Sequence, residues 1–227
     1  MIVVRYVLGA LLQPAILALL LFGPAGTFAW WRAWVLVGVV AVGTAVSLGG
    51  LARANPALLT ERLTRPLQEG QPFADKLILL VYLAAFAGLV AFIPEDVFRL
   101  RVFAAPAPIV STLGLGLFAA GWSLAAVALR ANAFAAPVVK HMAERRQAVV
   151  DTGVYAIVRH PMYAGIVLLL LGMPLWLESY AALLLASVPI TLLAVRIAIE
   201  ERFLRRALAG YGAYTERVRF RLIPGVW

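Results

Sequence analysis

The sequence predicts an all-α fold: a polytopic transmembrane helix bundle of about six spans, with a short C-terminal helical hairpin and a cytoplasmic C-terminal tail. Three observations carry this prediction. Hydrophobic residues make up 63% of the 227 residues, the mean hydropathy is +0.93, and several blocks without charge are as long as the hydrocarbon core of a bilayer is thick. This composition excludes a water-soluble globular protein and indicates an integral membrane protein.

The expected spans are the blocks that carry no charged residue. The first is expected to end near Phe22, because the Gly and Pro residues that follow it favour a turn. The last two blocks are separated only by Glu178 and each covers about 25 Å at 1.5 Å per residue, so they are expected to form a tight hairpin. The six blocks lie within residues 7–31, 33–52, 77–94, 102–129, 161–177 and 179–195.

The distribution of basic residues orients the bundle. The net charge is +9, with 20 Lys and Arg residues. With six spans and a cytoplasmic N-terminus, the outer segments carry only Arg32, Arg99 and Arg101, as the positive-inside rule requires. We therefore expect both the N-terminus and the C-terminus in the cytoplasm, and the basic residues to meet membrane lipids.

Several function classes are excluded by composition. The chain has no cysteine and only two histidines, so disulfides, thiolate chemistry and a histidine metal centre are not expected. The positive charge flanks apolar spans and forms no basic stripe with interleaved aromatic residues, so we expect no nucleic-acid partner.

The chain divides by chemistry at about residue 130. Residues 1–130 contain the first four expected spans, with almost nothing ionisable inside them. Residues 131–227 mix polar segments with the helical hairpin and end in a basic tail. Ionisable groups within a membrane are costly and mark functional sites, so the functional region is expected in 131–227.

Arg159, His160 and Pro161 stand at the start of the fifth span. Proline suits the first position of a helix, and a helix N-terminus with two basic neighbours favours a carboxylate or phosphate. The alternative is that Arg159 and His160 only anchor the helix at the interface. Tyr163 has the same two interpretations, and Gly165 is a candidate for helix packing.

Arg196 and Glu200 lie one helical turn apart and share a helix face. They can form a structural salt bridge near the interface, or they can line a site. Glu201 strengthens the second interpretation, because adjacent carboxylates point to different sides, one toward a pocket and one toward water. Tyr211 and Tyr214 either close that pocket or anchor the chain at the interface.

From about residue 138 onward the chain resembles the isoprenylcysteine carboxyl methyltransferase-like family of integral membrane methyltransferases, which includes related bacterial lipid and thiol methylating enzymes. The order and spacing of the motifs carry this resemblance. They are Gly153-x-Tyr155, Arg159-His160-Pro161-x-Tyr163-x-Gly165, Arg196 with Glu200-Glu201, Tyr211-x-x-Tyr214, and Arg221-Leu222-Ile223-Pro224.

The resemblance implies an S-adenosylmethionine-dependent enzyme in a bacterial inner membrane, acting on a lipophilic acceptor. It implies that Glu200 holds a polar group of the cofactor and that Arg196 orients or polarises the acceptor, as the catalytic pair. The chain departs from the eukaryotic pattern at Lys140 and Gln147, which stand where a glutamine and a histidine are used. The residues expected to bind the cofactor are Gln147, Ala148, Val149, Val150, Tyr155, Arg159, His160, Pro161, Met162, Tyr163 and Glu200.

The chemistry agrees with this composition. A sulfonium methyl group is already electrophilic, so the protein has to align donor and acceptor and exclude water, and no metal is required. Two alternatives remain from the sequence: an NADPH-dependent membrane reductase of the sterol-reductase type, and a non-enzymatic membrane scaffold. The reductase is disfavoured because no second nucleotide-binding segment is evident.

Overall fold

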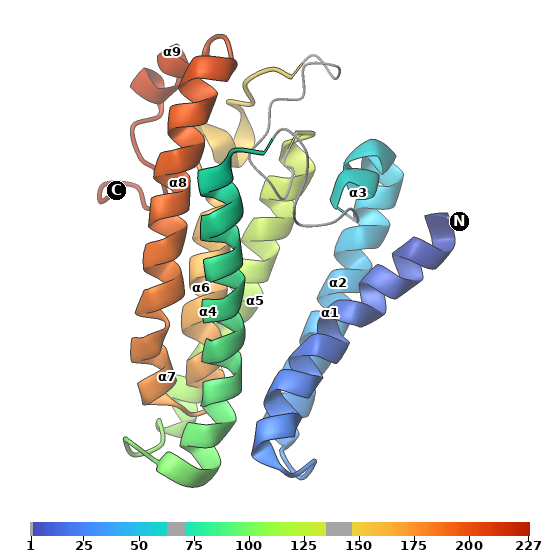
Figure 1. Cartoon of the computed structure of the whole chain (residues 1–227), viewed down its shortest axis with the longest axis vertical. Coiled ribbons are helices and arrows are strands. Elements are labelled where there is room, and N and C mark those ends of the chain that lie inside the picture. Colours follow the sequence, from blue (N-terminus) through green and yellow to red (C-terminus); the bar gives the residue numbers. More distant parts are fainter. Residues whose placement is uncertain (1, 63–70, 135–146) are drawn as a thin grey trace.

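A computed structural model describes residues 2–62, 71–134 and 147–227. Within these ranges the chain is helical, with no strand, which confirms the expected all-α class (Figure 1). The elements are α1 (Ile2–Ala25), α2 (Trp31–Ala54), α3 (Pro56–Arg62), α4 (Phe73–Glu95), the π-helical turn η1 (Asp96–Leu100), α5 (Pro108–Ala131), the 3₁₀ turn η3 (Gly153–Ala156), α6 (Pro161–Trp176), α7 (Tyr180–Leu185), α8 (Ser187–Ala207) and α9 (Tyr211–Arg217).

The apolar helices agree with about six spans. Four helical segments of the described chain are long and apolar enough to cross a membrane: Trp31–Ala54, Phe73–Leu100, Pro108–Ala131 and Tyr180–Ala207. Two shorter apolar helices, Gly9–Ala25 and Pro161–Trp176, complete the set. The short fifth span was expected from the sequence, because Pro161 and Glu178 bound it closely.

The second helix of the C-terminal hairpin carries Arg196 and Glu200 together, as expected. The sixth charge-free block ends at residue 195, but α8 continues through the charged residues to Ala207. Arginine and glutamate are good helix formers, and Arg196 and Glu201 are buried against other elements, so nothing ends the helix at the first charge. The last two turns of α8 therefore carry the polar residues of interest on a rigid helix.

Helices α5 and α6 pack against each other along most of their length, and glycines make this possible. A Cβ atom on Gly165 would lie 2.6 Å from the carbonyl oxygen of Gly121, and a Cβ on Gly121 would lie 2.6 Å from the carbonyl oxygen of Gly165. Two turns further along, a Cβ on Gly172 would lie 2.6 Å from the carbonyl oxygen of Gly114. Small residues at such spacing let the two backbones touch, so the helix-packing role expected for Gly165 is confirmed.

At one end of the bundle, polar contacts join distant segments. Arg32 at the start of α2 forms a salt bridge of 2.8 Å with Glu178 in the α6–α7 turn, and its guanidinium lies 4.7 Å from the ring centre of Trp176. The buried carboxylate of Asp96 accepts a hydrogen bond of 2.6 Å from the Ser179 hydroxyl. These contacts hold the α6–α7 turn against α2 and η1.

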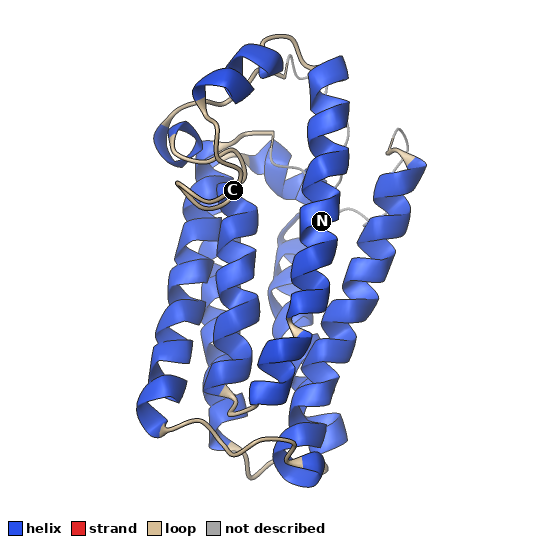
Figure 2. Cartoon of the chain, turned by 90° about the vertical axis from the view of Figure 1, so that its left-hand side faces the viewer, coloured by secondary structure: helices blue, strands red, loops and turns tan. Residues whose placement is uncertain are grey.

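At the opposite end, the C-terminal segment folds back over the start of α6 (Figure 2). The backbone N–H groups of Arg159 and His160 donate to the carbonyl oxygens of Phe220 and Arg221, each at 2.9 Å. Helix α9 lies beyond the end of α8 at this same end of the bundle (Figure 1). The polar motifs singled out from the sequence are thereby gathered in one place.

Replacing Gly165 with leucine should destabilise the bundle, because the new side chain meets the backbone of α5. Overpacking of this kind costs about 1–3 kcal/mol or more, and thermal unfolding in detergent measures it. The matched control is Gly116→Leu in α5, because nothing lies within 4 Å of a Cβ at that position. Equal melting temperatures of the two variants would contradict the packing described.

Candidate active site

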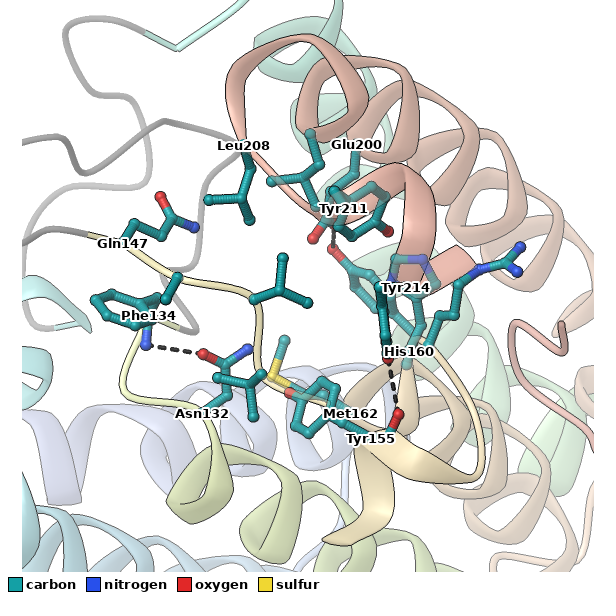
Figure 3. Close-up of a pocket in the computed structure, with 16 residues that line it drawn as sticks. Asn132, Phe134, Gln147, Tyr155, His160, Met162, Glu200, Leu208, Tyr211 and Tyr214 are labelled. Carbon is teal, nitrogen blue, oxygen red and sulfur yellow. Dashed lines mark hydrogen bonds between the residues drawn. The ribbon is translucent and has the colours of Figure 1, made fainter. Parts of the chain in front are cut away.

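A pocket opens at the end of the bundle where α6 begins and α8 ends (Figure 3). It encloses about 810 Å³ of empty space, including its open mouth. Segments from four parts of the chain line it: the end of α5 with the residues after it, the segment before η3, the start of α6, and α8 with α9. The lining residues are Asn132, Phe134, Gln147, Ala148, Val149, Val150, Tyr155, Arg159, His160, Met162, Tyr163, Glu200, Leu204, Leu208, Tyr211 and Tyr214.

Most residues that the sequence singled out lie on this one pocket. Two of them do not line it: Pro161, the first residue of α6, and Arg196. Lys140 falls outside the described residues. The residues from the same segments that line the pocket are Gln147, Ala148, Val149, Val150, Tyr155, Arg159, His160, Met162, Tyr163 and Glu200.

Four lining residues escaped the sequence analysis. Leu204 and Leu208 follow Glu200 at intervals of four residues, so the helical period alone placed Leu204 on the same face of α8. Asn132 and Phe134 follow the end of α5, and no motif marks them. Their place on the pocket depends on where α5 ends relative to α6.

Glu200 presents its carboxylate to the pocket and is half-buried. The hydroxyl of Tyr163 on α6 donates a hydrogen bond of 2.7 Å to Glu200 Oε2. This contact leaves oxygen lone pairs of the carboxylate able to accept further hydrogen bonds. The expectation that one of the two adjacent glutamates faces a pocket is therefore confirmed for Glu200.

Glu201 does not face water, contrary to the expectation, because its carboxylate is buried among basic groups. Glu201 Oε1 lies 2.7 Å from Arg159 Nε and 3.2 Å from His160 Nε2, and Glu201 Oε2 lies 3.2 Å from Arg221 Nη2. A buried carboxylate needs such partners to offset its desolvation. Glu201 thus joins α8 to the start of α6 and to the C-terminal segment.

Arg159 extends this connection. Its Nη1 donates hydrogen bonds to the carbonyl oxygens of Val218 at 2.8 Å and of Arg219 at 2.9 Å. The guanidinium is therefore held by Glu201 and by the chain that follows α9. Arg159 lines the pocket, but its Nε and Nη1 atoms are engaged by Glu201 and by the C-terminal segment.

Among the salt bridges of the described residues, Arg196 pairs with Asp75 rather than with Glu200, its neighbour on the same helix face. Its Nε instead lies 3.0 Å from Asp75 Oδ1 in the first turn of α4, and its guanidinium lies 5.9 Å from the ring centre of Tyr163. Asp75 is fully buried and also accepts a hydrogen bond of 2.7 Å from Gln71 Nε2. The sequence analysis missed Asp75, although a charged residue at the edge of an apolar helix was the available signal.

The two tyrosines of α9 close one side of the pocket. Burial raises the pKa of Tyr211, and the neighbouring charges of Glu201 and Glu200 raise it further. Burial also raises the pKa of Tyr214, whose hydroxyl donates to the carbonyl oxygen of Tyr155 at 2.8 Å (Figure 3). Both side chains therefore keep their protons at neutral pH, so the Tyr211 hydroxyl is able to donate a hydrogen bond, as that of Tyr214 does.

A family model described as phospholipid methyltransferase matches residues 109–210. The matched segment contains α5, α6 and α8, with Tyr163, Arg196 and Glu200 inside it. The phospholipid methyltransferase family is itself a member of the isoprenylcysteine carboxyl methyltransferase-like group of integral membrane methyltransferases. The resemblance inferred from the motifs is thereby confirmed. A search of curated proteins finds no match.

Replacing Glu201 with glutamine should destabilise the protein, because Arg159 and Arg221 lose their shared counter-charge. Removing one partner of a buried ion pair costs about 3–5 kcal/mol. Unfolding in detergent gives the loss of stability, and amide hydrogen exchange at Arg159 and His160 reports release of the C-terminal segment. The matched control is Glu216→Gln, an exposed glutamate of α9, which should change stability by less than about 0.5 kcal/mol. Native-like protection at both amides would show that Glu201 does not hold this junction.

Proposed function

We propose that this membrane methyltransferase uses S-adenosylmethionine and methylates the amine of a phospholipid that reaches the site from the bilayer. One observation carries the proposal. Met162 lines the polar pocket and also lines a second, apolar cavity between the helices. A water-soluble donor and a lipid acceptor can therefore meet at the start of α6.

The pocket has a donor and acceptor set suited to S-adenosylmethionine. The Glu200 carboxylate can accept hydrogen bonds from an ammonium or from ribose hydroxyls, and the Tyr211 hydroxyl can donate one. Val149, Leu204 and Phe134 supply apolar surface for a purine ring. When bound, the cofactor supplies an electrophilic methyl group. These residues hold and orient the donor.

The second cavity suits an acyl chain. It lies between α1 and α2 on one side and α4, α5 and α6 on the other, and it encloses about 2870 Å³ including its open side. Along α6 its lining runs from Met162 to Met173, which is about 16 Å at 1.5 Å per residue. An acceptor lying in this groove has its polar head at Met162, next to the pocket.

The residues around Met162 have to align the acceptor and keep water out, because alignment supplies most of the rate in such a transfer. We propose that Glu200 and Tyr163 form the polar wall where the amine arrives. Arg196 lies behind Tyr163 and is held by Asp75, so we propose that Arg196 acts by positioning Tyr163 and its partner Glu200. The other cofactor-binding residues expected from the sequence remain part of this proposal.

Labelled methyl transfer tests the proposed function directly. Detergent-purified protein is incubated with isotopically labelled S-adenosylmethionine and lipid extract, and mass spectrometry identifies the labelled product. Thermal shift with S-adenosylmethionine and with NADPH separates a methyltransferase from a reductase. Stabilisation by NADPH alone would favour the reductase, and stabilisation by neither would favour the scaffold.

Replacing Glu200 with glutamine should weaken S-adenosylmethionine binding by about tenfold or more, since a hydrogen bond to a charged group contributes about 1.5–3 kcal/mol. Calorimetry measures the affinity, and the unfolding temperature verifies the fold. The control is again Glu216→Gln, which lies away from the pocket. Unchanged affinity in the Glu200 variant would refute its assignment.

A further inference from the structure

The apolar groove contains a small group of polar side chains. We call Gln13, Thr44, Ser47 and Tyr82 the polar band; all four line the groove. The Thr44 hydroxyl donates to Gln13 Oε1 at 3.1 Å, and Trp122 Nε1 donates to Ser47 Oγ at 3.2 Å. The band therefore comprises residues of α1, α2 and α4, and Trp122 links it to α5.

The hydrogen bonds described above do not use every donor group of the polar band. In the described part of the chain, the Gln13 amide nitrogen and the Tyr82 hydroxyl donate no hydrogen bond. Polar groups in hydrocarbon are costly unless they are paired. Interhelical hydrogen bonds alone explain Thr44 and Ser47, but they do not explain the donors of Gln13 and Tyr82 that face the groove.

The depth of the band follows from helix packing. Gly121, the neighbour of Trp122, packs against Gly165, and Gly165 lies three residues from Met162, or about 5 Å along α6. A Cβ on Gly43 would lie 2.6 Å from the Trp122 ring, which sets α2 at the same level. The band thus begins roughly 5 Å below Met162, close to the thickness of about 5–8 Å that separates a lipid head group from the hydrocarbon core.

The chemistry of the band selects a neutral acceptor. Its spare groups include an amide N–H and a phenol O–H, and the described residues that line the groove include no cation to attract a phosphate. The nearby guanidinium of Arg196 acts on Tyr82 but is paired with Asp75. Acyl carbonyl oxygens are the neutral acceptors that a lipid carries at this depth. We propose that Gln13 and Tyr82 donate hydrogen bonds to the acyl carbonyl oxygens of the acceptor lipid, so that the enzyme selects ester-linked over ether-linked lipids. This inference rests on the proposed function.

Two lipids with the same head group test the inference: diacyl phosphatidylethanolamine and its dialkyl ether analogue. For the wild type, kcat/KM should be about tenfold higher with the diacyl lipid than with the ether lipid, as two neutral hydrogen bonds predict. The difference should arise from a lower KM for the diacyl lipid. Tyr82→Phe and Gln13→Leu should each reduce this ratio several-fold by weakening the diacyl lipid alone. Leu83→Ala, an apolar lining residue next to Tyr82, is the matched control and should weaken both lipids equally.

Thermal stabilisation of the purified protein by each lipid, without S-adenosylmethionine, separates this inference from the proposed function. Suppose that neither lipid is methylated but that the diacyl lipid stabilises the wild type more than it stabilises Tyr82→Phe. The proposed function then fails, while the inference that the polar band binds acyl carbonyl oxygens is supported. If the wild type shows the same kcat/KM and the same thermal stabilisation with both lipids, the inference about the polar band is refuted. A preference retained in full by Tyr82→Phe and Gln13→Leu would also overturn it. Tyr82→Phe removes a single oxygen atom, so it decides the matter alone if Gln13→Leu fails to fold.

Discussion

The buried carboxylate of Glu201 is the contact on which the site end of this protein depends. It joins three segments that are far apart in the sequence: α8, the start of α6 through Arg159 and His160, and the C-terminal segment through Arg221. In a medium of low dielectric, an unpaired carboxylate or guanidinium is far more costly than the pair. The arrangement is therefore held by the need to keep every partner in place.

This use of Glu201 explains how its neighbour remains available. Two adjacent residues of a helix point in directions about 100° apart at 3.6 residues per turn, so one faces the junction and the other faces the pocket. Glu200 contacts Tyr163 at the pocket wall, while Glu201 joins α8 to the start of α6 and to the C-terminal segment. A rigid helix thus sets the orientation of a functional carboxylate through the burial of the residue beside it.

The glycine contact between α5 and α6 has a comparable effect on the membrane side. Because the two backbones touch at Gly121 and Gly165, α6 is held against α5 and the groove opens on its other side, toward α1 and α2. Met162 stands where this groove meets the pocket. The first spans, which carry almost no ionisable residues, thereby supply one wall of the groove. Helix α4 also supplies Asp75 as the partner of Arg196.

The sequence by itself determined the class of the protein, the approximate spans and most of the pocket, because hydropathy, helical period and the motif from Arg159 to Gly165 are local properties. It did not reveal that Glu201 is buried, that Arg196 pairs with Asp75, or that Asn132 and Phe134 reach the pocket. Those outcomes depend on which helices lie side by side. A charged residue in a membrane takes whichever partner the packing brings within reach, and only the tertiary structure decides which partner that is.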